Sequence, residues 1–229
     1  MFLPNAPAAE VYQLHILLLH INPPVWRRLH VRSDTSIAML HELLQIAFDW
    51  SDFHLHRFLI RGKAYGMSRL GGCGFTTDAR KVVLSQFRFR TNERFLYEYD
   101  FVDLWQHQIR FESVAPIEGK KSYPVCFAGA CASPPEDCGG PEASMDKMDH
   151  HRWNPPLDEL QLIADAAGRV LDAHGQERVR DVLGDVDALE EAIDRLETYQ
   201  RFQPDHFDRR RINRRLKQWA EGNKMCISE

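Results

Sequence analysis

Residues 95–111 of the chain read FLYEYDFVDLWQHQIRF, and this stretch decides the fold. Apolar and polar residues alternate on both sides of a short turn at Val102-Asp103, and the apolar row after the turn also holds His107. Because successive side chains of a strand point to opposite faces, this alternation predicts an antiparallel hairpin with one buried face. The residues expected on the buried face are Tyr97, Tyr99, Trp105, Ile109 and Phe111.

Four further strands are expected before this hairpin. The aliphatic run 11–20 predicts a central strand, and the alternation at 25–31 predicts its hairpin partner. A period of two at 53–60 predicts a strand with His54 and His56 on one face, and 82–89 is expected to be another strand.

An amphipathic helix is expected at 36–48. Its apolar residues recur every three or four positions, so one face of the helix suits packing on a sheet. Asp34 or Thr35 is expected to cap its first turn.

The stretch 123–141, YPVCFAGACASPPEDCGGP, follows the hairpin and combines three cysteines with rigid and permissive backbone. Pro134-Pro135 removes two backbone donors, and Gly139-Gly140 permits the positive φ of a tight return. We therefore expect neither an ordinary helix nor a strand here, but a costly segment that meets a packed partner or a ligand.

From Pro155 onward the pattern becomes helical. Apolar periodicity marks helices at 160–171 and 189–199, a short helix around 176–183, and a last helix after the cap Asp208. Strands followed by helices, without βαβ alternation, predict an α+β fold: a mainly antiparallel sheet with a packed amphipathic helix and a helical C-terminal region. We expect a core at 10–141 and a helical extension at 142–221 that packs back on it.

The composition of the 229-residue chain is that of a globular protein, with 44% hydrophobic residues and five cysteines. No run approaches the ~20 apolar residues of a membrane span, and the start has no signal-peptide pattern, so we expect a cytoplasmic protein without membrane contact. In that compartment the cysteines are reduced thiols, metal ligands or core residues. The net charge of −4 argues against a globally basic nucleic-acid binder.

Six segments, in this order, together resemble the plasmid pRiA4b ORF-3-like family, whose members include passenger proteins of bacterial insertion elements. The resemblance covers most of the chain and implies an α+β fold and an association with plasmids and transposons, without implying a reaction. The turn departs from the family pattern YDFGD, because Val102 replaces the glycine, and 143–153 matches loosely. The six segments are PPVWRRLHV at 23–31, LHELLQIAFDW at 40–50, HLHRFLI at 54–60, YEYDFVDLWQHQI at 97–109, CASPPEDCGGP at 131–141 and FDRRRINRRL at 207–216.

The cysteines of 123–141 offer a zinc site. Cys126, Cys131 and Cys138 supply three thiolates, and His107, or else His54 or His56, would complete a tetrahedral set. The alternative is that the three cysteines are small buried hydrophobic residues, as free cysteine often is.

A second set of polar residues is expected to converge in a pocket. Carboxylates with histidines form metal sites or acid/base pairs, and loops often carry such groups. The alternative is structural, with carboxylates that cap turns and histidines that bond to carbonyls. The set comprises His54, His56, Asp100, Asp103, His107, Glu136 and Asp137.

The last helix is basic. Residues 201–217 hold seven Lys/Arg and two Asp, and Arg210, Arg214 and Lys217 fall opposite the apolar stripe of the helix. Such a face suits contact with DNA phosphates. The alternative is that these cations pair with the acidic stretch 185–197.

The sequence therefore predicts an accessory or binding protein associated with mobile DNA, with DNA or a mobile-element protein as its partner. The rival function is a metal-dependent enzyme, hydrolytic in type, that uses the His/Asp/Cys pocket and takes zinc as its cofactor.

Overall fold

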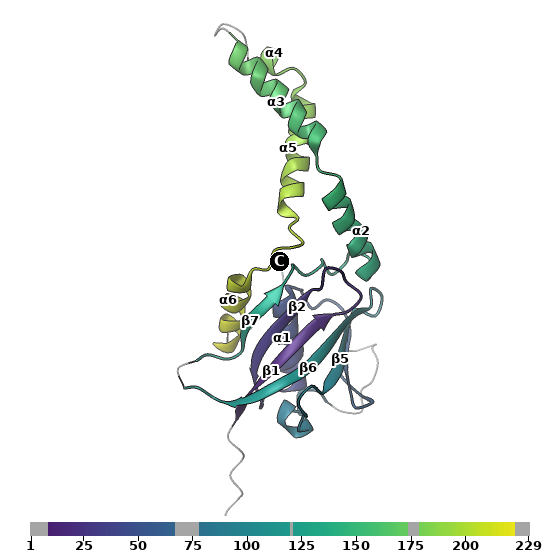
Figure 1. The fold of residues 1–229 in the computed structure, drawn as a ribbon, viewed down its shortest axis with the longest axis vertical. Helices are drawn as coiled ribbons and strands as arrows, with labels where there is room; N and C mark the ends of the chain where they lie inside the picture. The colour runs from purple at the N-terminus through teal and green to yellow at the C-terminus, as the bar shows by residue number, and fades with distance from the viewer. Residues whose placement is uncertain (1–8, 67–77, 120, 174–178, 223–229) are drawn as a thin grey trace, which may run out of the picture. The chain divides into compact units, whose positions relative to one another are not determined.

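The computed structural model describes residues 9–66, 78–119, 121–173 and 179–222. Its centre is a seven-stranded sheet in the order β4-β3-β5-β6-β1-β2-β7, with every neighbouring pair antiparallel (Figure 1). The sheet and its helices confirm the predicted α+β fold. The strands are β1 (Glu10–Leu18), β2 (Trp26–Arg32), β3 (His56–Ile60), β4 (Lys63–Tyr65), β5 (Arg94–Tyr99), β6 (Trp105–Pro116) and β7 (Val125–Ala130).

The predicted hairpin is β5 and β6. Tyr97 lies opposite His107 and Tyr99 opposite Trp105, so the apolar rows of the two strands share one face. All five residues expected in the core are buried, and Phe111 is the only one of the five that is not fully so. The apolar residues that alternate in the sequence are thus the residues on the buried face of the hairpin.

Helix α1 (Ile37–Phe48) covers one face of the sheet, behind the strands in Figure 1. Its cap is Ser36, whose Oγ accepts a hydrogen bond from the Met39 backbone N–H at 3.1 Å. The prediction of Asp34 or Thr35 was wrong, because Asp34 pairs instead with Arg32 on β2. Ser36 has the extended backbone of an N-cap, with φ −73° and ψ 161°.

Two segments differ from the sequence prediction. Strand β7 lies inside 123–141, where no strand was expected, and it pairs with β2 before the two prolines begin. The segment 82–89 is not a strand but contains a short 3-10 helix, η1 (Leu84–Phe87). Its Leu84 N–H donates to Thr35 O, and Val82 O accepts from Ile37 N–H, so backbone bonds to the start of α1 replace sheet pairing.

The chain forms two compact units, Met1–Met145 with Asp205–Glu229, and Asp146–Pro204. The first unit contains the sheet, α1 and α6 (Arg209–Ala220). Helix α2 (Gly140–Trp153) begins in the first unit and runs into the second, and it was not predicted. The second unit also contains α3 (Leu157–Asp172), α4 (Val179–Leu183) and α5 (Val186–Arg201), of which α3 and α5 pack together.

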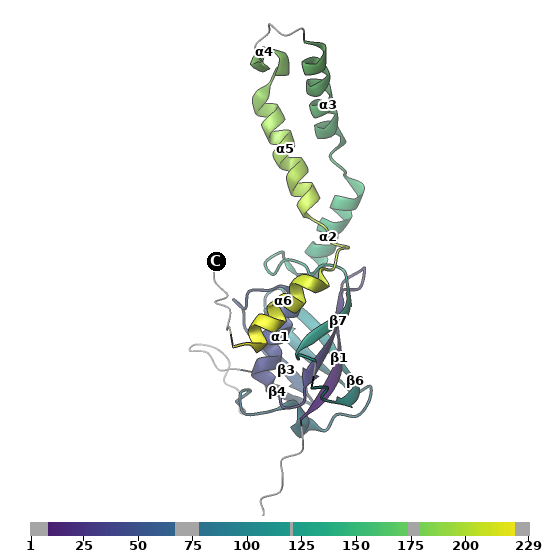
Figure 2. The same ribbon diagram turned by 90° about the vertical axis from the view of Figure 1, so that its left-hand side faces the viewer.

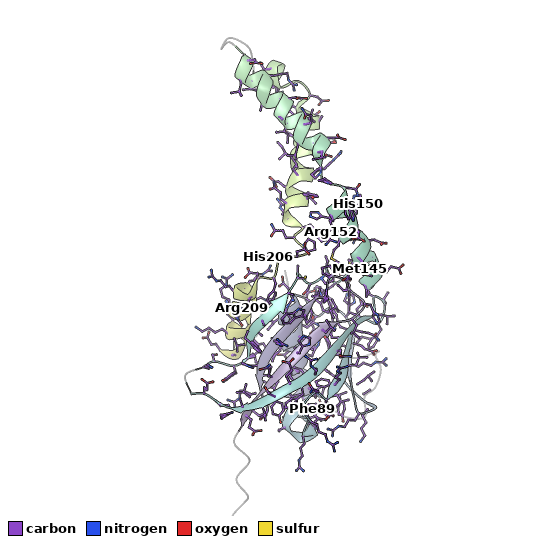
Figure 3. All side chains as sticks on the ribbon, in the orientation of Figure 1. Phe89, Met145, His150, Arg152, His206 and Arg209 are labelled. Carbon is purple, nitrogen blue, oxygen red and sulfur yellow. The ribbon has the colours of Figure 1, made fainter. Side chains whose placement is uncertain are left out.

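Helix α6 lies against α1 and β7 in the first unit (Figure 2). Asp208 caps it by accepting from the Arg211 N–H at 2.9 Å, as predicted. Its own residues Ile212 and Leu216 are buried on the face that packs against the sheet unit. Arg209 reaches β7 and donates to Phe127 O at 2.8 Å (Figure 3).

In the part of the chain that the structure describes, no helix has both the length and the apolar character that a membrane crossing requires.

Candidate functional site

Three loops of the sheet unit meet around the side chains of Trp50 and Trp105. The Trp50 indole N–H donates to Pro134 O at 2.8 Å, and that of Trp105 donates to Glu136 O at 3.0 Å. The Pro-Pro loop is therefore held against the end of α1 and the β5–β6 turn. This loop does meet a packed partner, as 123–141 predicted.

Glu136 joins the same loops through its side chain. Its carboxylate accepts from both the backbone N–H and the hydroxyl of Ser51, and from the Tyr99 hydroxyl at 3.3 Å. Burial raises the pKa of Tyr99, so the phenol keeps its proton and acts as a donor. Glu136 is thus largely occupied in holding the loops together.

The first group of metal-ligand side chains, which we call the His54 group, consists of His54, Asp100 and Asp137. One ligand atom from each lies within 4.8 Å of the others. His54 Nε2 is 2.8 Å from Asp137 Oδ1, and His54 Nδ1 is 3.6 Å from Asp100 Oδ2. The side chain of Asp100 is buried, whereas that of Asp137 is 72% exposed. The group therefore runs from the interior to the solvent.

The second group, which we call the His41 group, consists of His41, Asp52 and His56. The rings of His41 and His56 are stacked, with centroids 3.4 Å apart and an interplanar angle of 11°. His41 Nε2 is 2.8 Å from Asp52 Oδ1, and its Nδ1 is 2.8 Å from the Tyr97 hydroxyl.

Hydrogen bonds assign the protons along the His41 group. Asp52 N–H donates to Gln45 Oε1 at 3.2 Å, which leaves Gln45 Nε2 to donate to the Tyr97 oxygen at 2.9 Å. Burial raises the pKa of Tyr97, so its hydroxyl keeps a proton and donates it to His41 Nδ1. His41 then carries its own proton on Nε2 and donates it to Asp52. His41 is well satisfied without a metal.

The structure brings together His54, Asp100 and Asp137, and the Tyr99 hydroxyl links the His54 backbone to Glu136, so four of the seven residues predicted for the pocket are connected. His56 belongs to the His41 group. Asp103 has the structural role of the alternative interpretation, because its Oδ2 accepts from the Gly139 N–H at 3.0 Å.

His107 is a core residue. It is fully buried against the rings of Phe48, Trp50 and Tyr97, with centroids 4.5, 5.2 and 5.3 Å away. Burial, assisted by the charge of Arg27, lowers the pKa of His107 to about 3. The imidazole is therefore neutral at physiological pH.

The cysteine cluster does not form. Among the residues that the structure describes, Cys126, Cys131, Cys138 and His107 are not a group whose ligand atoms lie within 4.8 Å of one another. Cys126 donates to Ala128 O at 3.4 Å, and burial raises its pKa to about 11. Cys126 is fully buried and its thiol already has a backbone acceptor, which favours the core interpretation. In the described residues the two bends therefore do not bring the three thiols within metal-binding distance of one another.

The cations of α6 divide into two sets. Arg211 and Arg215 both pair with Asp49, the residue that ends α1. Arg210 and Arg214 are exposed and make no ion pair with any residue that the structure describes. Lys217 is 3.7 Å from Glu221, and both side chains are more than half exposed. In α5, by contrast, Glu191 and Glu197 pair with arginines of the same helix.

Sequence reasoning missed His41, Asp49 and Asp52. His41 lies in α1 among apolar neighbours, and a signal was present, because it is four residues from Ile37 and three from Leu44 on the same helical face. The two aspartates lie in the loop after α1, and no local pattern marks their partners.

Comparison with known proteins identifies the family. The family model described as Plasmid pRiA4b ORF-3-like protein matches residues 10–169. The chain belongs to the plasmid pRiA4b ORF-3-like family. It is 36% identical over 134 residues to the uncharacterized protein y4hQ of Sinorhizobium fredii (strain NBRC 101917 / NGR234), a match that covers 58% of this chain and 69% of the relative.

A solved structure shares the fold of this family member. The crystal structure of a protein of unknown function, MM3350 from Methanosarcina mazei Go1, matches with a TM-score of 0.62 and 27% sequence identity. The match covers 89% of this chain and 97% of that chain.

Proposed function

We propose that the protein is an accessory protein of mobile DNA that contacts DNA phosphates through the exposed face of α6. The observation that carries this proposal is that Arg210 and Arg214 are exposed without an ion pair among the described residues, whereas Arg211 and Arg215 of the same helix pair with Asp49 and Arg209 donates to Phe127 O. With Lys217 they form a row at i, i+4 and i+7, which is one face of an α-helix.

Little interaction energy within the protein has to be given up before the three cations bind phosphate. The Lys217–Glu221 contact is a solvent-exposed pair, and such pairs contribute only about 0–1 kcal/mol. All three cations are therefore available to phosphates at little cost. Contacts to phosphate position a protein on DNA but do not read its sequence, so we expect binding with little sequence preference.

Membership of a family described by a plasmid reading frame supports the association with mobile DNA. The proposal keeps the expected cytoplasmic location, where plasmid DNA lies. A protein of the same mobile element is the other partner that this face would suit.

The test is a filter-binding titration of duplex DNA at several salt concentrations. The variant Arg210→Ala/Arg214→Ala/Lys217→Ala should flatten the log–log salt slope by up to roughly 0.9 per lost phosphate contact. Because the buried residues of α6 are untouched, its melting temperature should stay close to that of the wild type.

A matched control removes the same charge elsewhere on the sheet unit. Lys63, Lys81 and Lys121 are exposed, and their triple alanine variant should bind like the wild type. If both variants lost DNA affinity equally, binding would depend on the net charge of the protein and not on the face of α6. Absence of wild-type binding at low salt would exclude direct DNA contact and move a protein partner forward.

The second candidate is a metal-dependent hydrolytic enzyme. It is favoured by the His54 group, where a half-buried imidazole lies between a buried carboxylate, Asp100, and an exposed one, Asp137. Hydrolysis of a phosphodiester and of a carboxylic ester, measured with and without Zn²⁺ or Mn²⁺, tests this function. A metal-dependent rate that His54→Ala abolishes would support it, whereas equal rates with and without metal would reject it.

A further inference from the structure

Within the His54 group, His54 Nδ1 and Asp100 Oδ2 face each other at 3.6 Å. Asp100 is fixed by its backbone N–H, which donates to Leu55 O at 2.9 Å, and by its Oδ1, which accepts from the Val102 N–H at 2.9 Å. Its second oxygen is turned toward His54. The His54 backbone N–H donates to the Tyr99 hydroxyl at 3.3 Å, so both residues are held in place.

Asp137 determines which nitrogen of His54 carries the proton. An ionised carboxylate only accepts hydrogen bonds, so the 2.8 Å contact with Asp137 Oδ1 assigns a proton to Nε2. In a neutral imidazole, Nδ1 then presents a lone pair. That lone pair faces the Asp100 carboxylate, whose side chain is only 4% exposed.

Two acceptors that face each other in a buried place repel unless positive charge lies between them. We propose that a divalent metal ion binds at this point, with His54 Nδ1 and Asp100 Oδ2 as ligands. Two ligands at about 2.0–2.2 Å from a tetrahedral zinc ion are separated by roughly 3.4 Å. The observed separation is 3.6 Å.

Asp137 has the role of an outer-shell carboxylate that fixes the imidazole. Histidines that bind metals commonly donate their other ring N–H to a carboxylate, which orients the ring. Mixed nitrogen and oxygen donors suit a transition-metal cation such as Zn²⁺ or Mn²⁺. The His54 side chain is itself 30% exposed, so the group is not sealed from solvent. The inference is independent of DNA contact by α6, and it rests on the residues of the second candidate function.

The competing occupant is a second proton, which would make His54 an imidazolium between two carboxylates. A charge-assisted N–H···O bond shortens to about 2.7–2.9 Å. The Asp137 contact has this length, but the Asp100 contact at 3.6 Å does not. The asymmetry favours a metal over a proton on the Asp100 side.

The His41 group is the rival metal site in the same chain. There the 2.8 Å contacts place protons on both sides of His41, and the two imidazoles are stacked in parallel. A single metal needs the lone pairs of both rings to converge, which face-to-face stacking does not allow. The His54 group therefore fits a cation better.

Calorimetric titration of metal-depleted, untagged protein with Zn²⁺, and separately with Mn²⁺, tests the proposal. One ion per chain is expected. Asp100→Asn keeps the bond to Val102 N–H and should weaken binding at least tenfold, as should His54→Ala. Asp137→Asn should weaken it by about 10–100-fold, as expected of an outer-shell partner.

Two control variants test whether the loss of metal binding is specific to the His54 group. His206→Ala removes an exposed histidine and His56→Gln alters the His41 group, and both should retain the bound ion. Circular dichroism confirms that each variant is folded, and ¹⁵N NMR should show the His54 Nδ1 resonance shift on metal addition. The proposal would be overturned if neither His54→Ala nor Asp100→Asn changed the metal affinity, or if His56→Gln lost the ion. It would also be overturned if NMR showed a doubly protonated His54 and no metal bound at millimolar concentration.

Discussion

The side-chain amide of Asn213 pairs with the backbone of Cys126 as a neighbouring strand would. The Cys126 N–H donates to Asn213 Oδ1, and Asn213 Nδ2 donates to Cys126 O, both at 2.8 Å. Strand β7 is at the end of the sheet order, so these backbone groups would otherwise have no partner across the edge. An exposed strand edge invites pairing with other chains, and α6 covers it here.

Asn213→Ala removes both hydrogen bonds of this edge. Each buried backbone group left without a partner costs about 1–3 kcal/mol, so we expect a loss of about 2 kcal/mol in the free energy of unfolding and more self-association on storage. Urea denaturation and light scattering measure the two effects. Gln218→Ala, at an exposed position of the same helix, should change stability by less than about 0.5 kcal/mol. Equal stability of the two variants would contradict the role of the amide.

Arg27 is a buried charged residue on β2. Its guanidinium donates to Ala47 O, Trp26 O and Ala130 O at 2.8–3.0 Å and lies over the Phe207 ring at 4.3 Å. Gly129 makes room for that ring, because a Cβ there would be 2.6 Å from it. Burial lowers the pKa of Arg27 to about 10, so it remains charged at neutral pH.

Arg27→Lys should destabilise the protein by about 2–4 kcal/mol. A single ammonium group does not span the three carbonyl groups, so at least one buried acceptor loses its donor. Arg28→Lys is the matched control, because Arg28 pairs with Glu112 near the surface and should cost no more than about 1 kcal/mol. Urea midpoints of the two variants provide the comparison, and a cost for Arg27→Lys as small as that of the control would refute this account.

His107 makes the fold sensitive to acid. The folded pKa of about 3 lies below the ordinary value of 6.5, so between these values the unfolded chain binds a proton that the folded chain excludes. Stability therefore falls as the pH falls from 6.5 toward 3, by about 1.4 kcal/mol per pH unit from this residue alone. His107→Leu should flatten the dependence when urea midpoints are measured at pH 4, 5, 6 and 7. Parallel curves for the two proteins would exclude His107 as the cause.

Trp105 connects the sheet to the Pro-Pro loop. Trp105→Ala creates a cavity in the core and leaves Glu136 O without its donor, so we expect a loss of about 3–5 kcal/mol. Trp153 is 76% exposed, and Trp153→Ala should be nearly neutral. Thermal melts of both variants test the contrast. A near-neutral Trp105→Ala would contradict the burial of the hairpin face.

The sequence predicted the hairpin and α1 well because their signals are local. Most apolar residues of 95–111 have a cross-strand partner within 14 positions, and the alternation continues through His107. Strand β7 was missed for the opposite reason. Its pairing with β2 joins residues about a hundred positions apart, and the prolines and glycines that follow it dominated the interpretation of 123–141.

The site was predicted only in part. His54, Asp100, Glu136 and Asp137 were named because carboxylates and histidines stand out in any sequence. Their meeting depends on three loops that Trp50 and Trp105 bring together, which no local pattern records. The cysteines stood out equally, but their spacing did not show that Cys126 and Cys138 would each donate to a carbonyl group two residues further along the chain.

The covering of the β7 edge by α6 has a consequence for synthesis on the ribosome. Cys126 and Asn213 are 87 residues apart, and the second unit is translated between them. At 5–20 residues per second, β7 waits roughly 4 to 17 s for the helix that covers it. During that interval the nascent sheet has an open side, so its safe folding depends on how quickly the intervening helices are made.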